Sequence, residues 1–186
     1  MANLGNSFAL YANFTPGNTN SIPPTTDLSG FANAQRTFAG GPLSAGQGFK
    51  ISLATGYRNG SKGIDLYDSS WNQLFNFSVS NDKYYAGSSE LTWAYAEDSL
   101  WNITATQVSS SQLQVSVLRG SDSYTSSLIN GSLNAFKLYA SDIGGTEDVR
   151  NLFANNLQII PEPSSSMLMG LGLAGLAALR RFRKIT

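Results

Sequence analysis

The sequence of 186 residues contains no cysteine and no histidine. Without cysteine, the chain can form no disulfide, no thiolate metal site and no cysteine nucleophile. Without histidine, it lacks the commonest general base, the usual proton shuttle and the commonest zinc ligand. A Ser-His-Asp triad is therefore excluded, although serine is abundant. The chain is nevertheless long enough to bury a hydrophobic core without covalent cross-links.

Charged residues are scarce as well, at 13% of the chain, and they are distributed unevenly. Residues 1–160 carry eight basic and eleven acidic side chains, a net charge of −3, whereas residues 161–186 carry a net charge of +3. A mildly acidic body offers no positive surface to a phosphate backbone. We therefore expect no nucleic-acid partner, and the basic residues of the tail need a separate explanation.

The tail consists of four successive segments. Pro161, Glu162 and Pro163 end the body, because proline is excluded from a central strand or a helix interior. They open a Pro/Ser linker at residues 161–166, which is followed by an apolar run at residues 167–179. The chain then ends in a basic cluster, Arg180, Arg181, Arg183 and Lys184, within a C-terminal segment at residues 167–186.

The apolar run predicts a short hydrophobic helix. Its length would be about 20 Å at 1.5 Å per residue, against roughly 30 Å for a bilayer's hydrocarbon core. With the preceding serines and snorkelling arginines, it just crosses a thinned bilayer. The positive-inside rule keeps the basic cluster in the cytoplasm and places residues 1–160 on the far side. A helix packed on the body is disfavoured because the apolar run has no polar face. A permanent single-span membrane anchor remains an alternative to a processed tail.

This order of segments, from Pro161 to Lys184, resembles the PEP-CTERM sorting signal. The resemblance implies recognition by an exosortase, a membrane-embedded processing enzyme, with removal of the tail. It also implies a Gram-negative-type bacterial envelope and an association with exopolysaccharide or biofilm. We therefore expect an exported protein of the cell surface or extracellular space, whose C-terminal helix lies in the inner membrane before processing.

Residues 1–7 lack the basic and apolar regions of a signal peptide, so we expect the natural start to lie elsewhere.

The body, residues 1–160, has a strand-type pattern. Apolar residues alternate with polar ones most clearly at Phe49, Ile51 and Leu53, which places one face of that strand in a core. Short runs of this kind are separated by Gly, Asn, Asp and Ser. They predict ten strands, at residues 8–13, 48–55, 63–67, 73–79, 90–95, 100–107, 112–119, 124–129, 135–140 and 152–160. This regular series predicts an all-β fold, an antiparallel β-sandwich.

The order of elements suggests a particular sandwich. An Asn59-Gly60 turn follows the strand at 48–55, a hairpin joins 100–107 to 112–119, and Asn155-Asn156-Leu157 lies in the closing strand. This order resembles the concanavalin-A/laminin-G type of jelly roll, which implies glycan binding only by analogy. Residues 18–46 form a long irregular excursion with a short strand at 35–38, serving either as a covering loop or as the wall of a ligand site.

The carboxylates give little support for catalysis. A glycosidase needs two carboxylates about 5–10 Å apart, but Asp65 and Asp68 are three residues apart and would lie on opposite faces of a strand. Glu97 and Asp98 are adjacent, so they would also lie on opposite faces of a strand. We interpret these residues as solvated loop charges and expect no enzymatic activity. A hydrolase with an unrecognised carboxylate pair is the third functional hypothesis, after the two given below.

Two candidate binding sites remain. The acidic, glycine-containing loop with Asp142, Glu147 and Asp148 offers oxygen ligands that suit calcium, although such loops are more often simple turns, and no other cofactor is expected. Seven Trp and Tyr side chains, at 57, 71, 84, 85, 93, 95 and 101, could supply a platform for sugar rings. We predict Tyr84, Tyr85 and Trp93 as this platform, with Tyr84-Tyr85 exposed in a polar loop. The alternative is that these aromatics fill the core.

The leading hypothesis is therefore a non-enzymatic, exported surface or extracellular-matrix protein associated with exopolysaccharide. The second is a carbohydrate-binding module with polysaccharide as its partner.

Overall fold

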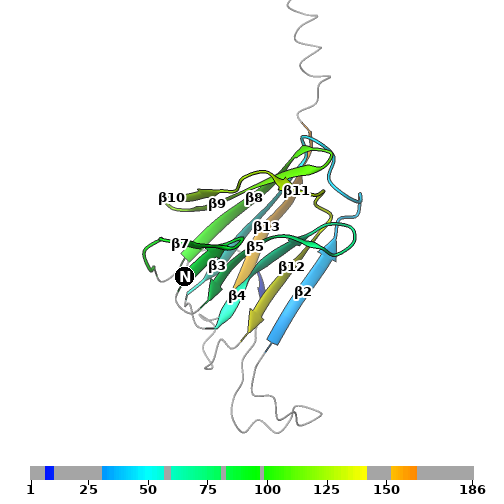
Figure 1. The fold of residues 1–186 in the computed structure, drawn as a ribbon. Coiled ribbons are helices and arrows are strands. Elements are labelled where there is room, and N and C mark those ends of the chain that lie inside the picture. The colour runs from blue at the N-terminus through cyan, green and yellow to red at the C-terminus, as the bar shows by residue number, and fades with distance from the viewer. Residues whose placement is uncertain are drawn as a thin grey trace, which may run out of the picture.

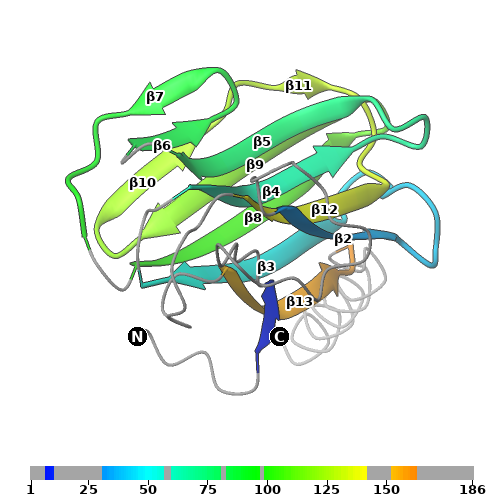
Figure 2. The same cartoon turned by 90° about the horizontal axis from the view of Figure 1, so that it is seen from below.

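The computed structural model describes residues 7–10, 31–56, 60–80, 83–96, 99–141 and 152–162. They form two antiparallel sheets packed face to face (Figures 1 and 2). The first sheet contains, in spatial order, β1 (Phe8–Leu10), β13 (Leu152–Ile160), β3 (Gly48–Thr55), β8 (Ser99–Ser109), β9 (Gln112–Arg119) and β10 (Asp122–Thr125), with β11 (Ile129–Asn130) also paired to β9. The second contains β2 (Phe31–Thr37), β12 (Ala135–Ser141), β4 (Ser61–Tyr67), β5 (Gln73–Ser80), β6 (Lys83–Ala86) and β7 (Ser89–Leu91).

This architecture confirms the prediction of an all-β, antiparallel sandwich. The chain passes repeatedly from one sheet to the other, as in a jelly roll. The predicted strands at 48–55, 112–119 and 152–160 match β3, β9 and β13 at both ends. The predicted C-terminal helix lies outside the described residues. Within the described part of the chain, no helix is long and apolar enough to cross a membrane.

The predictions were wrong at three places. Residues 90–95 do not form one strand: β7 ends at Leu91, and the preceding strand β6 was missed. Residues 124–129 are divided between β10 and β11. The excursion at 18–46 contains the seven-residue strand β2, which pairs along its whole length with β12. Side chains of β2 alternate between exposed and half-buried positions because it is an edge strand, and this weakened its hydrophobic pattern.

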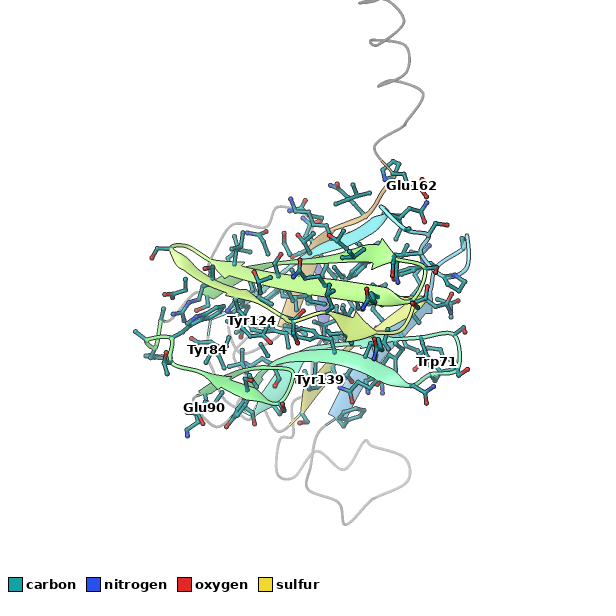
Figure 3. All side chains as sticks on the ribbon, turned by 45° about the horizontal axis from the view of Figure 1, so that its top comes forward. Trp71, Tyr84, Glu90, Tyr124, Tyr139 and Glu162 are labelled. Atoms are coloured by element: carbon teal, nitrogen blue, oxygen red, sulfur yellow. The ribbon has the colours of Figure 1, made fainter. Side chains whose placement is uncertain are left out.

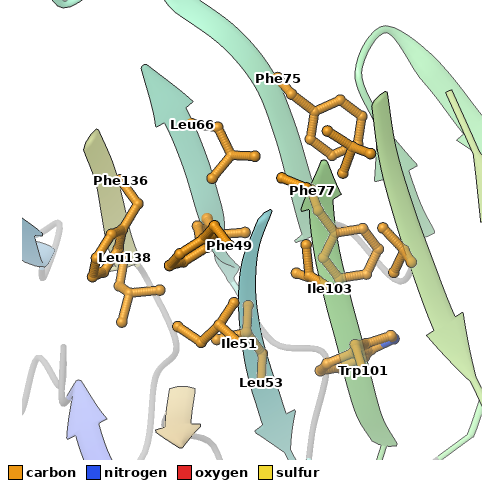
Figure 4. Packing of buried hydrophobic residues seen from close by; sticks show 14 of the residues in the cluster. Phe49, Ile51, Leu53, Leu66, Phe75, Phe77, Trp101, Ile103, Phe136 and Leu138 are labelled. Carbon is orange, nitrogen blue, oxygen red and sulfur yellow. The ribbon is translucent and has the colours of Figure 1, made fainter. Parts of the chain in front are cut away.

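The core lies between the sheets and follows the alternation in the sequence. Phe49, Ile51 and Leu53 are at most 1% exposed and point inward from β3, as Figure 4 shows. The ring of Phe49 lies 5.2 Å from that of Phe136 on the opposite sheet. Burying each such side chain contributes roughly 1.5–3 kcal/mol. Trp101 fills the same layer nearer the other end, 5.7 Å from Phe77.

Candidate functional site

A group of polar and aromatic residues lies on the outer face of the six-stranded sheet. Ile64 and Leu66 of β4 point into the core, so the alternating residues Asp65 and Tyr67 point outward. Strands β5 and β12 flank β4 and contribute the other members. We call this group the Asp65 cluster: Asp65, Tyr67, Gln73, Asn76, Lys137 and Tyr139.

Asp65 is the centre of the cluster and is only 6% exposed. Its Oδ1 accepts hydrogen bonds from Gln73 Nε2 at 3.0 Å and Asn76 Nδ2 at 2.7 Å. Its Oδ2 accepts one from Tyr67 Oη at 3.0 Å and pairs with Lys137 Nζ at 2.6 Å. These four donors occupy the acceptor capacity of the carboxylate. The interpretation of Asp65 as a solvated loop charge is therefore wrong, because its position on β4 places it beneath partners from three strands.

Lys137 and Tyr139 complete the electrostatic environment. Burial would lower the pKa of Lys137, but its hydrogen bonds to Asp65 and Tyr67 outweigh that effect and raise the pKa above its usual value. The Lys137 ammonium donates to Tyr67 Oη at 2.8 Å. Burial raises the pKa of Tyr139, whose hydroxyl accepts a hydrogen bond from Asn76 Nδ2 at 3.0 Å. The Lys137 ammonium therefore stays charged and the Tyr139 hydroxyl stays protonated at neutral pH.

The hairpin between β4 and β5 holds a tryptophan beside this cluster. Asp68 Oδ1 accepts from the backbone N–H groups of Ser70 at 2.8 Å and Asn72 at 2.9 Å, and Oδ2 accepts from Asn72 Nδ2 at 2.9 Å. The side-chain and backbone hydrogen bonds from Asn72, followed by that from Ser70, lower the pKa of Asp68. Asp68 is thus a turn residue, as the sequence suggested, and it fixes the backbone around Trp71.

Trp71 has an unusual backbone conformation. Its φ is +61°, in the left-handed region that costs a residue with a Cβ about 1–2 kcal/mol. Its ring lies 5.3 Å from the ring of Tyr67, tilted by 57°, and the residue is 44% exposed. Figure 3 shows Trp71 at one end of the sheet, with Tyr139 nearer its middle. The hairpin therefore presents a flat apolar surface to solvent, supported from below by Tyr67.

This arrangement combines a stacking surface with fixed polar groups. Aromatic faces pack against the apolar face of a sugar ring, while amides and ammonium groups hydrogen-bond to its hydroxyls. Gln73 and Asn72 are exposed next to Trp71, and the side chain of Lys137 is 26% exposed. Because the Asp65 carboxylate is fully engaged, the cluster offers binding groups and no available general base.

The aromatic residues predicted as a sugar platform are not an exposed set. Tyr84 is 1% exposed on the inner side of β6, and the Arg119 guanidinium lies 4.6 Å from its ring centre. The expectation of an exposed Tyr84-Tyr85 pair is therefore wrong, because the strand alternation of β6 turns Tyr84 inward and leaves only Tyr85, half-buried, outward. Trp93 packs against the core, with its ring 6.0 Å from that of Tyr84.

The predicted calcium ligands Asp142, Glu147 and Asp148 lie outside the described residues. Within the described ranges, no group of three or more acidic residues is placed to hold a metal ion. Of the sorting residues, Pro161 and Glu162 are exposed directly after β13, whereas Pro163 and the basic cluster Arg180, Arg181, Arg183 and Lys184 lie beyond the described chain.

In a comparison with known families, residues 160–184 match the PEP-CTERM protein-sorting motif. The chain thus carries this sorting signal, which confirms the resemblance noted in the tail. The signal marks an exported protein that is sorted by an exosortase and anchored in the membrane before processing. The match begins at Ile160, the last residue of β13, so the signal starts where the sandwich ends.

Solved structures with related folds share little sequence with this chain. A sialidase aligns with 72% of the chain but only 14% of its own length, at 12% identity and a TM-score of 0.47. A tetrameric galectin from the sponge Cinachyrella aligns with 70% of the chain and all of its own length, at 8% identity and a TM-score of 0.46. The agglutinin CG-16 from chicken liver aligns with 69% of the chain and 99% of its own length, at 8% identity and a TM-score of 0.45. No curated protein matches the sequence.

Proposed function

We propose that this exported protein is a non-enzymatic component of the cell surface or extracellular matrix and that it binds polysaccharide through Trp71 and the Asp65 cluster. The observation that carries the proposal is the strained, half-exposed Trp71, whose ring is in tilted contact with that of Tyr67 beside a saturated polar network. Backbone strain at an exposed aromatic residue is a typical sign of a functional constraint. A hairpin under selection for stability alone would favour glycine at this position.

The same network supports a binding role over a catalytic one. Asp65 is engaged by four donors, so it would have to lose a partner before it could accept a proton from a substrate or attack one. Asp68 is committed to the hairpin turn through the backbone of Ser70 and Asn72. A rigid, pre-formed polar surface is instead what a binding site requires, because little ordering accompanies association.

Trp71→Gly separates binding from stability. Glycine removes about 1–2 kcal/mol of left-handed strain while losing a ring contact that contributes about 0.5–1.5 kcal/mol. We therefore expect the free energy of unfolding to change by less than about 1 kcal/mol, whereas polysaccharide binding falls at least tenfold. Binding of the full chain in lipid nanodiscs to a panel of neutral and acidic polysaccharides, by biolayer interferometry, measures the second quantity.

Phe31→Ala is the matched control for this variant. Phe31 is an aromatic residue of the same sheet, 60% exposed, and it pairs with Ser141 at the end of β12 away from Lys137. Its removal should leave the affinity unchanged. The proposed site would be rejected if Trp71→Gly bound every polysaccharide as well as the unchanged protein does, or if both variants lost binding equally.

Export to the surface or matrix predicts where the mature protein ends. If an exosortase removes the tail, the mature protein from its host should end between Pro161 and Ser166. Intact-mass spectrometry of the surface and extracellular fractions measures this end directly. A surface protein that still ended at Thr186 would instead indicate a permanent membrane anchor.

A further inference from the structure

A cleft opens between the two sheets at the edge where β2 of one sheet faces β1 and β13 of the other. Its volume is about 520 Å³, within the range typical of small-molecule sites. The floor is apolar and comes from both sheets: Ile51, Phe136, Leu138 and Ala154, each at most 7% exposed. The cleft is distinct from the Asp65 cluster, because it lies inside the sandwich and the cluster lies on the outer face of one sheet.

The rim of the cleft is partly apolar and partly cationic. Phe8 and Leu157 line it and are 54% and 41% exposed. Arg36 of β2 also lines it, and no carboxylate among the described residues pairs with this arginine. A guanidinium placed at the entrance of an apolar cavity suits an anionic group attached to an apolar chain.

A β-bulge shapes this entrance. The pairing of β13 with β3 shifts between Asn155 and Gln158, and Asn156 adopts a left-handed φ of +55°. Asn156 is held there by its side chain, which donates to Ser52 Oγ at 3.2 Å. Bulges of this kind re-aim side chains beside binding sites. Here the bulge contains Asn156 and Leu157, which line the cleft together with Arg36.

We propose that this cleft binds a single-chain amphiphile, with its apolar chain between the sheets and its anionic headgroup at Arg36. The argument combines the apolar floor, the exposed apolar rim and a guanidinium that pairs with no carboxylate in the described part of the chain. The location agrees with the chemistry, since β13 leads directly into the signal by which the protein is anchored in a membrane. The proposal is independent of polysaccharide binding by Trp71.

Photo-crosslinking tests the proposal on the full chain in lipid nanodiscs. The probes are a decanoate and a decanol that carry a diazirine on the terminal carbon. We expect the decanoate probe to label peptides from β2, β12 and β13 that line the cleft. Labelling of the tail peptide serves as an internal reference for probe dissolved in the bilayer.

Two kinds of variant identify the site. Arg36→Gln should reduce decanoate labelling of the cleft about tenfold and leave decanol labelling unchanged. Lys50→Gln, which removes another cation outside the cleft, should change neither. Ala154→Leu fills the cavity and should abolish cleft labelling by both probes, and Ala34→Leu provides the same test from β2 if the first variant folds poorly. Labelling confined to the tail, or cleft labelling that survives a folded cavity-filling variant, overturns the proposal.

Discussion

Gly63→Ala is expected to destabilise the fold by about 3 kcal/mol or more, an exceptional effect for the addition of one methyl group. Gly63 lies within β4, opposite Ser78 of β5. A Cβ at this position would lie 2.0 Å from the Phe77 carbonyl oxygen and 2.9 Å from the Cα of Ser78. Both atoms belong to the backbone of the neighbouring strand, so no rotamer change can relieve the overlap. Urea unfolding, followed by tryptophan fluorescence, gives the change in the free energy of unfolding.

Gly40→Ala is the matched control. An added Cβ there meets no atom within 4 Å, and its backbone does not adopt a positive φ. Alanine should therefore leave stability unchanged or raise it by up to about 1 kcal/mol, because it restricts the unfolded chain. Equal urea midpoints for the two variants would show that β4 and β5 can move apart without a loss of stability. The close approach of the β5 backbone would then not explain why glycine occupies position 63.

The same glycine also positions the candidate site. Tyr139 of β12 pairs directly with Gly63, and its hydroxyl bonds Asn76 of β5, on the far side of β4. The side chain of Tyr139 must therefore cross β4 to reach that amide. A residue without a side chain at Gly63 leaves this path open. We expect a partly folded Gly63→Ala variant to lose the Asp65 cluster before it loses the core.

The sandwich could be predicted because each strand shows its pattern of apolar and polar residues within a short stretch of sequence. Alternation at Phe49, Ile51 and Leu53 fixes an inner face whatever the partner strand is. The sorting signal is likewise a continuous segment with a fixed order of parts. Strand β6 could not be predicted from the sequence, because Tyr84 and Tyr85 both carry polar hydroxyls and lie in a polar stretch. Without a contrast between apolar and polar residues, the segment has the pattern of a loop.

The candidate site could not be predicted because its contacts are long-range and its hairpin is irregular. Lys137 reaches Tyr67 across 70 residues of sequence, a pairing that no local pattern encodes. The spacing argument for Asp65 and Asp68 assumed one continuous strand, whereas β4 ends at Tyr67 and its pairing with β5 shifts there. Trp71 was considered as one aromatic among seven. Its positive φ separates it from the other described members of that set, whereas its exposure of 44% equals that of Tyr95.

Asp65→Ala is expected to lower the free energy of unfolding by about 3 kcal/mol and to abolish polysaccharide binding. The substitution leaves Gln73, Asn76 and the Lys137 ammonium without their common acceptor, and a partly buried charge without its partner is costly. Asp65→Asn should retain part of the stability because an amide oxygen still accepts. Urea unfolding and the interferometry assay described above measure the two effects on the same preparations.

Glu90→Ala supplies the control for loss of a lysine-paired carboxylate on the same sheet. Glu90 bonds Lys83 at 2.8 Å, but both side chains are about half exposed, and exposed ion pairs contribute little to stability. Its removal should change neither stability nor binding appreciably. A loss as large as that of Asp65→Ala would mean that the charge balance of the sheet matters more than the buried network.

The double variant Asp65→Ala, Lys137→Met separates the two roles of the cluster. Removing both charges eliminates the unpaired ammonium, so the double variant should be more stable than Asp65→Ala alone. Together with the Lys137→Met single variant, the two measurements give the coupling energy between the pair. Polysaccharide binding should stay lost, because the Lys137 ammonium is gone and the Tyr67 hydroxyl has lost both of its polar partners. Recovery of binding along with stability would instead show that Trp71 needs only a folded support. The polar network would then be scaffold alone, and the binding site would reduce to Trp71 and Tyr67.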